Sequence, residues 1–405
     1  MTEQAKVPEI RFAGFTDPWE QRKFGDCFEF LKSNTLSRAG LNGENGTARN
    51  VHYGDILIKF GDCLDGERSD LPFITDDTVL PKYAGSILRE GDVIFADTAE
   101  DETAGKCVEL RKLPKEPTIS GLHTIPARPR FPFGMGYLGH YLNSDAYHRQ
   151  LLPLMQGIKV ISVSKAALQD TQVRFPGLSE QSAIGAALNE IDSLITLHQR
   201  KYDKLVVFKK SMLEKMFPKD GESVPEIRFA GFTDPWEQRK ASEVFQIVDD
   251  RGHPTLPVLS ATQNQGMIYR DDSGRYIGHD ESNEIGYKRV LPGDFVVHLR
   301  SFQGGFAHSQ YEGITSPAYT VFRAKEPTSH SDRFWKHWFM SEHFIAGLST
   351  VTYGIRDGRS ISVDEFMNTF LAFPAVEEQA AISRLFDYLD DLITLHQRKR
   401  LWFAK

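Results

Sequence analysis

Cysteine is scarce in this sequence, and its scarcity narrows what the protein can be. The 405 residues include three cysteines, Cys27, Cys63 and Cys107, all in the first half. An odd, sparse count without a CxxC pair argues against a disulfide framework or a zinc site. It is typical of a protein that works in a reducing cytoplasm, which is the location we expect.

Long apolar runs and basic charge are also lacking. No apolar stretch approaches the length needed to span a bilayer, and the opening MTEQAKVPEIRF lacks the basic-then-apolar pattern of a signal peptide. The net charge of −7 argues against a protein that coats nucleic acid nonspecifically, although a local basic surface still permits DNA binding. The length is sufficient for two or three domains with their own cores.

Catalytic motifs are missing as well. We find no Walker A motif, no HExxH and no complete carboxylate–lysine set of a nuclease. GMGYLG at Gly134–Gly139 satisfies GxGxxG, but no strand pattern precedes it and no acidic residue follows at the offset of a dinucleotide site, so it predicts a loop. DPW at Asp17–Trp19 faintly resembles an amino-methyltransferase signature, yet it lacks the second proline and occurs twice. We therefore expect no catalytic residue and no bound metal, and binding is favoured over chemistry.

What the sequence does contain is a long internal repeat. VPEIRFAGFTDPWEQRK occurs at Val7–Lys23 and again at Val224–Lys240, and LITLHQRK occurs at Leu194–Lys201 and again at Leu392–Lys399. We call the first repeat the cassette. A period of about two hundred residues is too long for a solenoid, so it indicates two homologous halves.

A variable region follows each cassette, at about Phe24–Thr171 and Ala241–Thr369. Short β-rich segments separated by glycine and proline predict strands at Asp55–Phe60, Gly91–Ala96, Gly157–Val163 and Gly293–His298. Helices are predicted at Gly139–Leu154 and Phe334–Leu348. Each variable region is thus expected to be a mixed α+β domain.

A long helical pattern ends each half, at Leu178–Phe217 and from Val376 onward. Apolar residues recur with a heptad period, which predicts a coiled-coil seam formed by Ile184, Leu188, Ile191, Ile195 and Leu205 with Ile382, Phe386, Leu389 and Ile393. His198 and His396 occupy equivalent seam positions, where a polar residue that sets the register is favoured over a metal ligand. The second helix stops at Lys405, which predicts an asymmetric far end of the coiled coil.

Basic residues suggest where DNA could bind. HLRSFQGG at His298–Gly305, YGIRDGRS at Tyr353–Ser360 and QGIKVISV at Gln156–Val163 place cationic or amide side chains beside glycines, which allow close approach to a ligand. The candidate DNA-binding residues are Lys159, Arg300, Gln303, Arg356 and Arg359. The lysines and arginines between Arg200 and Lys219 fit a solvated helix face and contact with a phosphate backbone or acidic partner equally well.

Taken together, these features resemble the specificity subunit of type I restriction–modification enzymes. The resemblance rests on the two-copy layout, on GDVIFADTAEDETAGKCVEL and SGLHTIPARP in the first variable region, on LPGDFVVHLRSFQGGF, ITSPAYTVFR and YGIRDGRSISVDEF in the second, and on FPxxxEQxAI at the start of both helices. It covers essentially the whole chain.

The resemblance implies an α+β protein with two homologous target-recognition domains separated by two long antiparallel coiled-coil helices related by a pseudo-twofold axis. Its parts would be the first cassette and domain at 1–177, a central helix at 178–217, the second cassette and domain at 218–375 and a final helix at 376–405. Each domain would read one half of a split site in double-stranded DNA. The chain itself would be non-catalytic and hold no cofactor. Methyltransferase subunits would supply S-adenosylmethionine for adenine methylation, and restriction–translocase subunits would use ATP and Mg²⁺.

Two other functions stay open on the sequence alone. The first is a stand-alone DNA methyltransferase or nuclease whose site the motifs do not reveal. The second is an interaction scaffold that never touches DNA. Methylation by the purified chain without added subunits would favour the first, and absence of DNA affinity even with a methyltransferase partner would favour the second.

Overall fold

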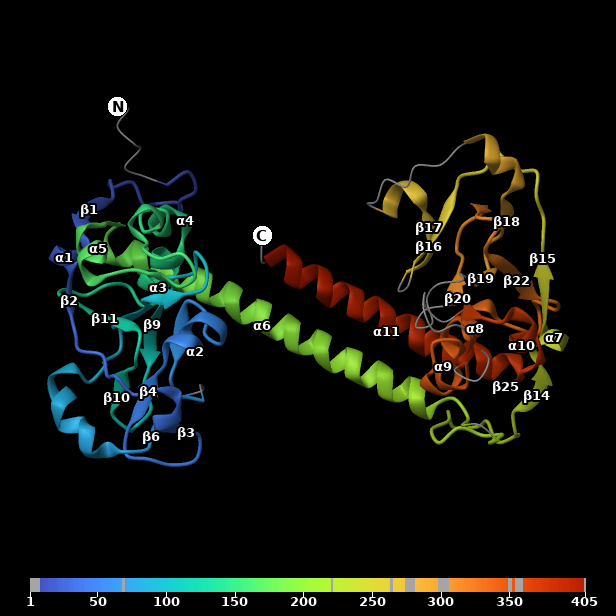
Figure 1. The fold of residues 1–405 in the computed structure, drawn as a ribbon, viewed down its shortest axis with the longest axis horizontal. Helices are drawn as coiled ribbons and strands as arrows, with labels where there is room; N and C mark the ends of the chain where they lie inside the picture. The colour runs from blue at the N-terminus through green and yellow to red at the C-terminus, as the bar shows by residue number, and fades with distance from the viewer. Residues whose placement is uncertain are drawn as a thin grey trace. The chain divides into compact units, whose positions relative to one another are not determined.

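The computed structural model describes residues 8–67, 70–219, 221–262, 265–273, 281–297, 306–348, 352–353 and 360–403. The chain divides into two compact units, Met1–Ile195 and Thr196–Lys405. The division falls inside one helix, α6, which runs from Leu178 to Lys215 (Figure 1). Within the described residues, no helix combines the length and apolar character that crossing a membrane requires.

The first unit is organised around a five-stranded sheet with the order β2-β11-β7-β9-β5. Its central strand β7 is buried along its whole length, and neighbouring β11 and β9 are both antiparallel to it. A four-stranded sheet, β10-β4-β6-β3, lies in the same unit. The bounds are β1 Glu20–Lys23, β2 Phe28–Phe30, β3 Leu41–Asn42, β4 Arg49–Val51, β5 Cys63–Asp65, β6 Phe73–Ile74, β7 Val93–Ala96, β8 Thr98–Ala99, β9 Cys107–Lys112, β10 Thr118–Ser120, β11 Thr124–Pro129, β12 Ile161–Ser162 and β13 Gln172–Phe175.

The helices of the first unit are short apart from α6. They are α1 Phe24–Cys27, α2 Tyr53–Ile58, α3 Tyr137–Asn143, α4 Asp145–His148 and α5 Lys165–Asp170, with 3-10 turns at Arg38–Gly40, Asp77–Ser86 and Leu152–Leu154. The strand predicted at Asp55–Phe60 is wrong, because this segment lies largely in α2. The His52 side chain accepts a hydrogen bond from the Gly54 amide and so caps a helix start that an apolar count does not reveal.

The second unit repeats the sheet with the order β15-β22-β19-β20, which matches β2-β11-β7-β9 strand for strand. Its bounds are β14 Glu237–Lys240, α7 Ala241–Val244, β15 Phe245–Val248, β16 Leu259–Thr262, β17 Gly266–Tyr269, β18 Lys288–Val290, β19 Phe295–Val297, β20 Phe306–His308, β21 Gly313–Thr315, β22 Thr320–Ala324, α8 Asp332–Trp338, α9 Glu342–Leu348, β23 Thr352–Tyr353, β24 Ser360–Ile361, α10 Val363–Asn368, β25 Phe370–Phe373 and α11 Val376–Phe403, with 3-10 turns at Arg270–Ser273 and Glu281–Gly286. The predicted mixed architecture of two homologous halves with long helices is confirmed.

Each variable region begins and ends at a narrow neck. In the first unit the cassette strand β1 pairs antiparallel with β13, and the Phe24 amide donates to the Thr171 carbonyl at 2.8 Å. In the second unit β14 pairs with β25, and the Ala241 amide donates to the Thr369 carbonyl at the same distance. The two chain ends of each variable region therefore lie side by side, so the region forms an insertion into a repeated frame.

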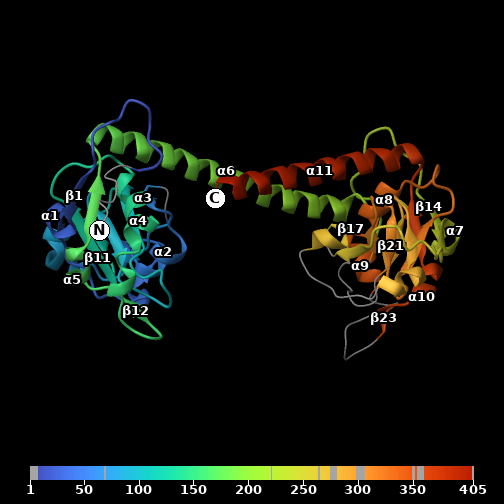
Figure 2. The same ribbon diagram turned by 90° about the horizontal axis from the view of Figure 1, so that it is seen from above.

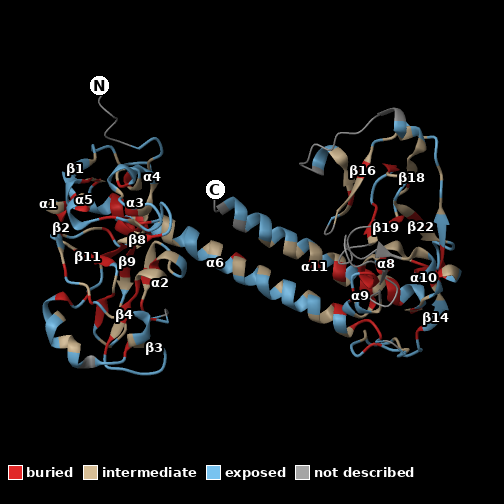
Figure 3. Ribbon diagram, in the orientation of Figure 1, coloured by how far each residue is buried: buried red, intermediate tan, exposed pale blue. Residues whose placement is uncertain are grey.

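The part of α6 in the second unit packs antiparallel against α11, which both ribbon views show (Figure 2). His198 contacts His396 and Phe217 stacks on Phe386, so residue numbers rise along one helix while they fall along the other. The core of this unit joins both helices to α8 and α9 through Leu213, Met216, Phe217, Ile382, Phe386, Leu389, Phe334, Trp335 and Phe344. Burial is concentrated at this junction, whereas much of the remaining helix surface is exposed (Figure 3).

The histidine pair between α6 and α11 indicates that the packing of these two helices loses stability at acid pH. The Nδ1 atoms of His198 and His396 are 2.8 Å apart, so one ring donates and the other must accept with a bare nitrogen. Burial, with nearby Lys399 and Lys201, lowers the pKa of both rings. A lowered folded-state pKa means that this stabilisation is present above the ordinary value of about 6.5 and is lost as pH falls below it.

We therefore expect the thermal unfolding midpoint of the second unit to fall between pH 8 and pH 5, and part of this fall to disappear in a His198→Leu/His396→Leu double variant. Differential scanning calorimetry at several pH values measures it. An identical pH profile in the double variant would show that the pair does not titrate with folding.

Candidate functional site

The start of each long helix is fastened to its cassette by a buried ion pair. The Arg11 guanidinium donates to both carboxylate oxygens of Glu180, each at 2.6 Å, and Arg228 donates to both oxygens of Glu378, each at 2.7 Å. The glutamate side chains are 2% and 1% exposed, respectively. Two parallel charge-assisted bonds fix both distance and orientation. The glutamate of FPxxxEQxAI is thus a clamp for the cassette arginine, a role beyond the interaction with the helix dipole that its position in the first turn suggests.

The glutamine of the same motif connects the helix to the variable region. Gln181 donates to the Pro176 carbonyl at 2.8 Å and accepts from the Gly134 amide at 2.9 Å. Gln379 donates to the Pro374 carbonyl at 2.8 Å and accepts from the Ser331 amide at 3.0 Å. A buried primary amide can satisfy both neighbours at once, which explains why the motif carries glutamine here.

The GMGYLG segment spans the turn before α3 and the first residues of that helix, and the amides of its three glycines donate to internal side chains. The buried Glu109 carboxylate accepts from the Gly136 amide at 2.6 Å and from the Gly139 amide at 2.8 Å. Gly136 has a left-handed φ of 84°, and a Cβ at Gly139 would lie 2.2 Å from the Asp62 carbonyl oxygen. The glycines therefore serve packing and an internal carboxylate, and their amides are not directed at a dinucleotide phosphate.

Of the candidate DNA-binding residues, the structure describes Lys159. It is exposed in the segment before β12, beside Ile158 and Val160, whose side chains are also exposed. Arg300, Gln303, Arg356 and Arg359 lie outside the described residues. Their role in DNA binding stays a prediction.

The predicted seam residues fall into two groups. Ile382, Phe386 and Leu389 are buried in the core of the second unit, with Leu205 packed against them, and Ile393 is half-buried. Ile184 instead packs into the core of the first unit, Ile191 is 36% exposed, and Leu188 and Ile195 are half-buried. The first half of α6 thus serves its own unit there, although its heptad pattern continues unbroken.

Some of the basic residues of α6 form ion pairs within the protein. Lys209 pairs with Asp390, Lys210 with Glu342 at 2.9 Å and Lys215 with Glu226 at 3.0 Å. Arg200, Lys201 and Lys204 are exposed. Contact with a phosphate backbone or an acidic partner would therefore fall mainly on the stretch before Leu205.

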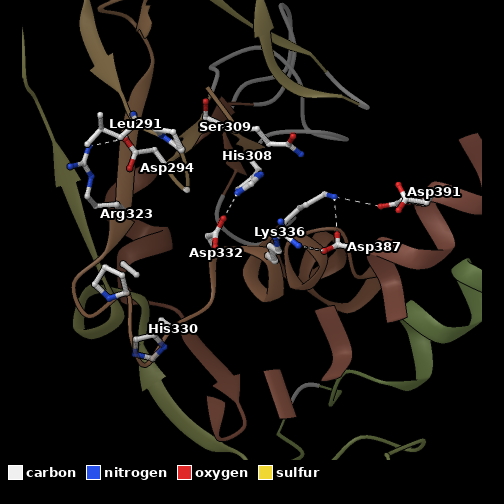
Figure 4. Close-up of a pocket in the computed structure, with 17 residues that line it drawn as sticks. Leu291, Asp294, His308, Ser309, Arg323, His330, Asp332, Lys336, Asp387 and Asp391 are labelled. Carbon is white, nitrogen blue, oxygen red and sulfur yellow. Dashed lines mark hydrogen bonds and ion pairs between the residues drawn. The ribbon is translucent and has the colours of Figure 1, made fainter. Parts of the chain in front are cut away.

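An open pocket of about 920 Å³ lies in the second unit between the sheet, α8 and α11. Most of its charged groups are paired: Arg323 with Asp294 at 2.7 Å, His308 with Asp332 at 2.7 Å, and Lys336 with Asp387 at 3.5 Å (Figure 4). Burial raises the pKa of Asp294, and the hydrogen bond from the Leu291 amide, Arg323 and His308 partly oppose that rise. The residues that line the pocket form an internal polar network. They do not form the nucleophile–base pair of a catalytic site.

The same network has a counterpart in the first unit. Asp92 accepts from Arg128 at 2.7 Å as Asp294 does from Arg323, and the two aspartates immediately precede the equivalent strands β7 and β19. Sequence reasoning missed these residues, and the shared GDVIF and GDFVV strings were the signal that could have found them.

We compared the chain with protein families and with known proteins. No family model matches the chain. It is 19% identical over 98% of its length to a chain described as the type I restriction enzyme MjaX specificity subunit of Methanocaldococcus jannaschii, and covers 91% of that chain. It is 24% identical over 60% of its length to the MjaVIII specificity subunit of the same organism, covering 61% of it. The resemblance to type I restriction specificity subunits is confirmed.

The fold agrees with that of such a subunit. The crystal structure of the S subunit of a type I restriction–modification system from M. genitalium superposes with a TM-score of 0.55 at 10% identity, over 99% of this chain and 96% of that one. At this identity the comparison supports similarity of the fold alone. Both cassettes, both variable regions and both helices fall within the matched length.

Glu109 offers a test of the first unit. Its burial raises its pKa, although the Gly136 and Gly139 amides oppose that rise. Glu109→Ala would leave two buried amides without an acceptor, and we expect a loss of about 2–4 kcal/mol in the local stability of α3. Hydrogen exchange of Tyr137–Asn143 followed by mass spectrometry measures this loss, with exposed Glu90→Ala as the matched control. Equal protection in both variants would contradict the assigned role.

Proposed function

We propose that the chain is the DNA-recognition subunit of a type I restriction–modification complex, with each variable region reading one half of a bipartite site. The observation that carries the proposal is the duplicated frame: two cassettes, two necks and two sheets of the same order, in a chain similar along its length to specificity subunits. A protein with two related reading domains matches a DNA site with two half-sites.

The frame and the reading surface are separate parts of the molecule in this proposal. Identical cassette residues hold both helix starts, so they belong to the frame. The variable regions differ in sequence, and specificity for a base sequence must come from residues that differ. Lys159, Arg300, Gln303, Arg356 and Arg359 remain the candidates for DNA contact.

Catalysis would come from partner subunits. The charged residues that line the pocket of the second unit are largely paired with one another, which supports a binding role. We propose that methyltransferase subunits carrying S-adenosylmethionine dock on the repeated frame and methylate adenine. Restriction–translocase subunits would join with ATP and Mg²⁺. Two identical cassettes in one chain suit two copies of the same partner.

Exchange of one variable region tests the proposal. The Phe24–Thr171 hydrogen bond marks ends that a related region can bridge without disturbing β1 or β13. We expect a chain with 24–171 replaced by the region of a relative to alter one half of the methylated sequence and to retain the other. Methylome sequencing of cells that express the chimaera with its methyltransferase subunit measures both halves.

The reciprocal exchange of 241–369 is the matched control, and it should alter the other half alone. A chimaera that folds and methylates but changes both halves at once would count against independent reading. Methylation by the purified chain without partners would overturn the non-catalytic role.

We expect the long helices to set the length of the gap between the half-sites. One helix, α6, runs through the boundary of the two units, so we infer that its length contributes to the spacing of the half-sites. Seven residues inserted after Leu197 and again after Leu395 preserve the heptad and add roughly 10 Å of rise, or about three base pairs. We expect both half-site sequences to be kept and the unspecified gap to lengthen.

Insertion of four residues after Leu197 alone is the contrasting variant. It shifts the heptad by about half a repeat and should mostly damage folding. Methylome sequencing of the paired heptad variant decides the matter, since an active enzyme with an unchanged gap would show that the helices do not set the spacing.

A further inference from the structure

Two clusters of histidine and carboxylate occupy equivalent positions in the two units. The first consists of Asp62, His140 and Asp192, and the second of His337, Asp387 and Asp390. Each histidine is the fourth residue of a matching helical segment, YLGH in α3 and FWKH in α8. Asp192 and Asp390 stand at the same distance before the shared LITLHQRK.

The second cluster contains its own cations. Lys209 pairs with Asp390, and the Lys336 ammonium lies 3.5 Å from both Asp387 and Asp390. His337 binds Asp387 at 2.9 Å. These two ammonium groups, together with the Arg333 guanidinium 3.5 Å from Asp387, pair with both carboxylates of the second cluster.

The first cluster lacks these cations. Gly139 stands where the second unit has Lys336, and Asn189 stands where it has Asp387. Lys106 is near, but its ammonium donates to the carbonyls of Leu57 and Phe60. Among the described residues, Asp62 and Asp192 form ion pairs with His140 alone.

The donor atoms around His140 lie slightly farther apart than the ligand atoms of a bound metal ion. Its Nδ1 lies 2.9 Å from Asp62, and Asp62 also accepts from Asn143 at 2.8 Å, so the ring is held by a carboxylate that is itself held. Such a carboxylate on the far nitrogen is the usual support of a metal-binding histidine.

The other ring nitrogen faces three further donor atoms. From His140 Nε2, Asn189 Oδ1 is 3.4 Å away, Asp192 Oδ2 is 3.9 Å and Cys63 Sγ is 4.0 Å. Ligand atoms on a tetrahedral zinc ion are separated by about 3.3–3.8 Å, given Zn–N near 2.0 Å and Zn–S near 2.3 Å. Small side-chain rotations would bring nitrogen, oxygen and sulfur donors onto one ion.

The local field is unbalanced in the direction that a cation would correct. The carboxylates of Asp62 and Asp192 and the thiol of Cys63 surround one imidazole, and the ion pairs of these carboxylates within the described residues involve no lysine or arginine. A divalent ion would balance these carboxylates, as the two lysines do in the second unit.

We propose that His140, Asp192, Cys63 and Asn189 form a site for one divalent transition cation of the zinc class, supported by Asp62. Binding releases the Cys63 proton to solvent, because the thiolate is the ligand. The ion joins α3 and the strand β5 of the variable region to α6 of the frame, and so takes the place that Lys336 and Lys209 fill in the second unit. The site is independent of what the variable region reads on DNA.

Cobalt titration of the full-length chain tests the site. After treatment with a chelator and dialysis, Co²⁺ should bind with one equivalent and produce visible d–d absorption together with a thiolate-to-cobalt charge-transfer band, both removed by Zn²⁺. His140→Gln and Asp192→Asn should abolish the one-equivalent binding. Asp62→Asn should weaken it by about 10–100-fold, as loss of a supporting carboxylate does. Cys63→Ser should remove the charge-transfer band.

The equivalent variants His337→Gln and Asp390→Asn are the matched controls, and they should leave the cobalt spectrum unchanged. Asp192 has an exposed side chain, so Asp192→Asn is expected to fold even if His140→Gln does not. The proposal fails if the wild-type chain binds no stoichiometric cobalt, if Asp192→Asn binds it as the wild type does, or if Cys63→Ser retains the charge-transfer band.

Discussion

Two bidentate arginine–glutamate pairs hold the repeated frame together. Each joins a cassette to the first turn of a long helix, and each glutamate is almost fully buried. A buried carboxylate is tolerated only when it is paired and hydrogen-bonded, so the cassette arginine and the helix glutamate depend on each other. The adjacent glutamine extends the same joint to the variable region. These polar contacts thus act with the apolar packing of Ile184 and Ile382 to hold the start of each helix on its unit.

The neck makes the variable region a separable part of this frame. β1 with β13, and β14 with β25, carry the chain into and out of the region through one short antiparallel pair. The cassettes on one side of that pair are identical in the two halves, whereas the regions beyond it differ in sequence. Such an arrangement allows the inserted domain to change its surface while the joint, the helix start and the cassette remain the same.

Within the common frame, the two units fill equivalent positions differently. Glu109 on β9 accepts the amides before and within α3, whereas His308 at the equivalent place on β20 binds Asp332 at the start of α8. Gly139 and Lys336 are a second such pair. One unit uses internal lysines to balance its carboxylates, and the other presents the same carboxylate position without them.

The sequence by itself determined the duplication, the mixed fold class and the long helices, because exact repeats and heptad periodicity are local properties that survive without a structure. It also determined the limits of the variable regions to within a residue of the neck hydrogen bonds. It failed at Asp55–Phe60, an apolar segment that lies largely in a helix whose start is capped by the His52 side chain. Only the tertiary structure decided that Ile184 belongs to its own unit's core while Leu205 joins α11, since one heptad pattern fits either neighbour. Only it brought Asp62, His140 and Asp192 together, because residues scattered over more than a hundred positions meet through packing that no local pattern encodes.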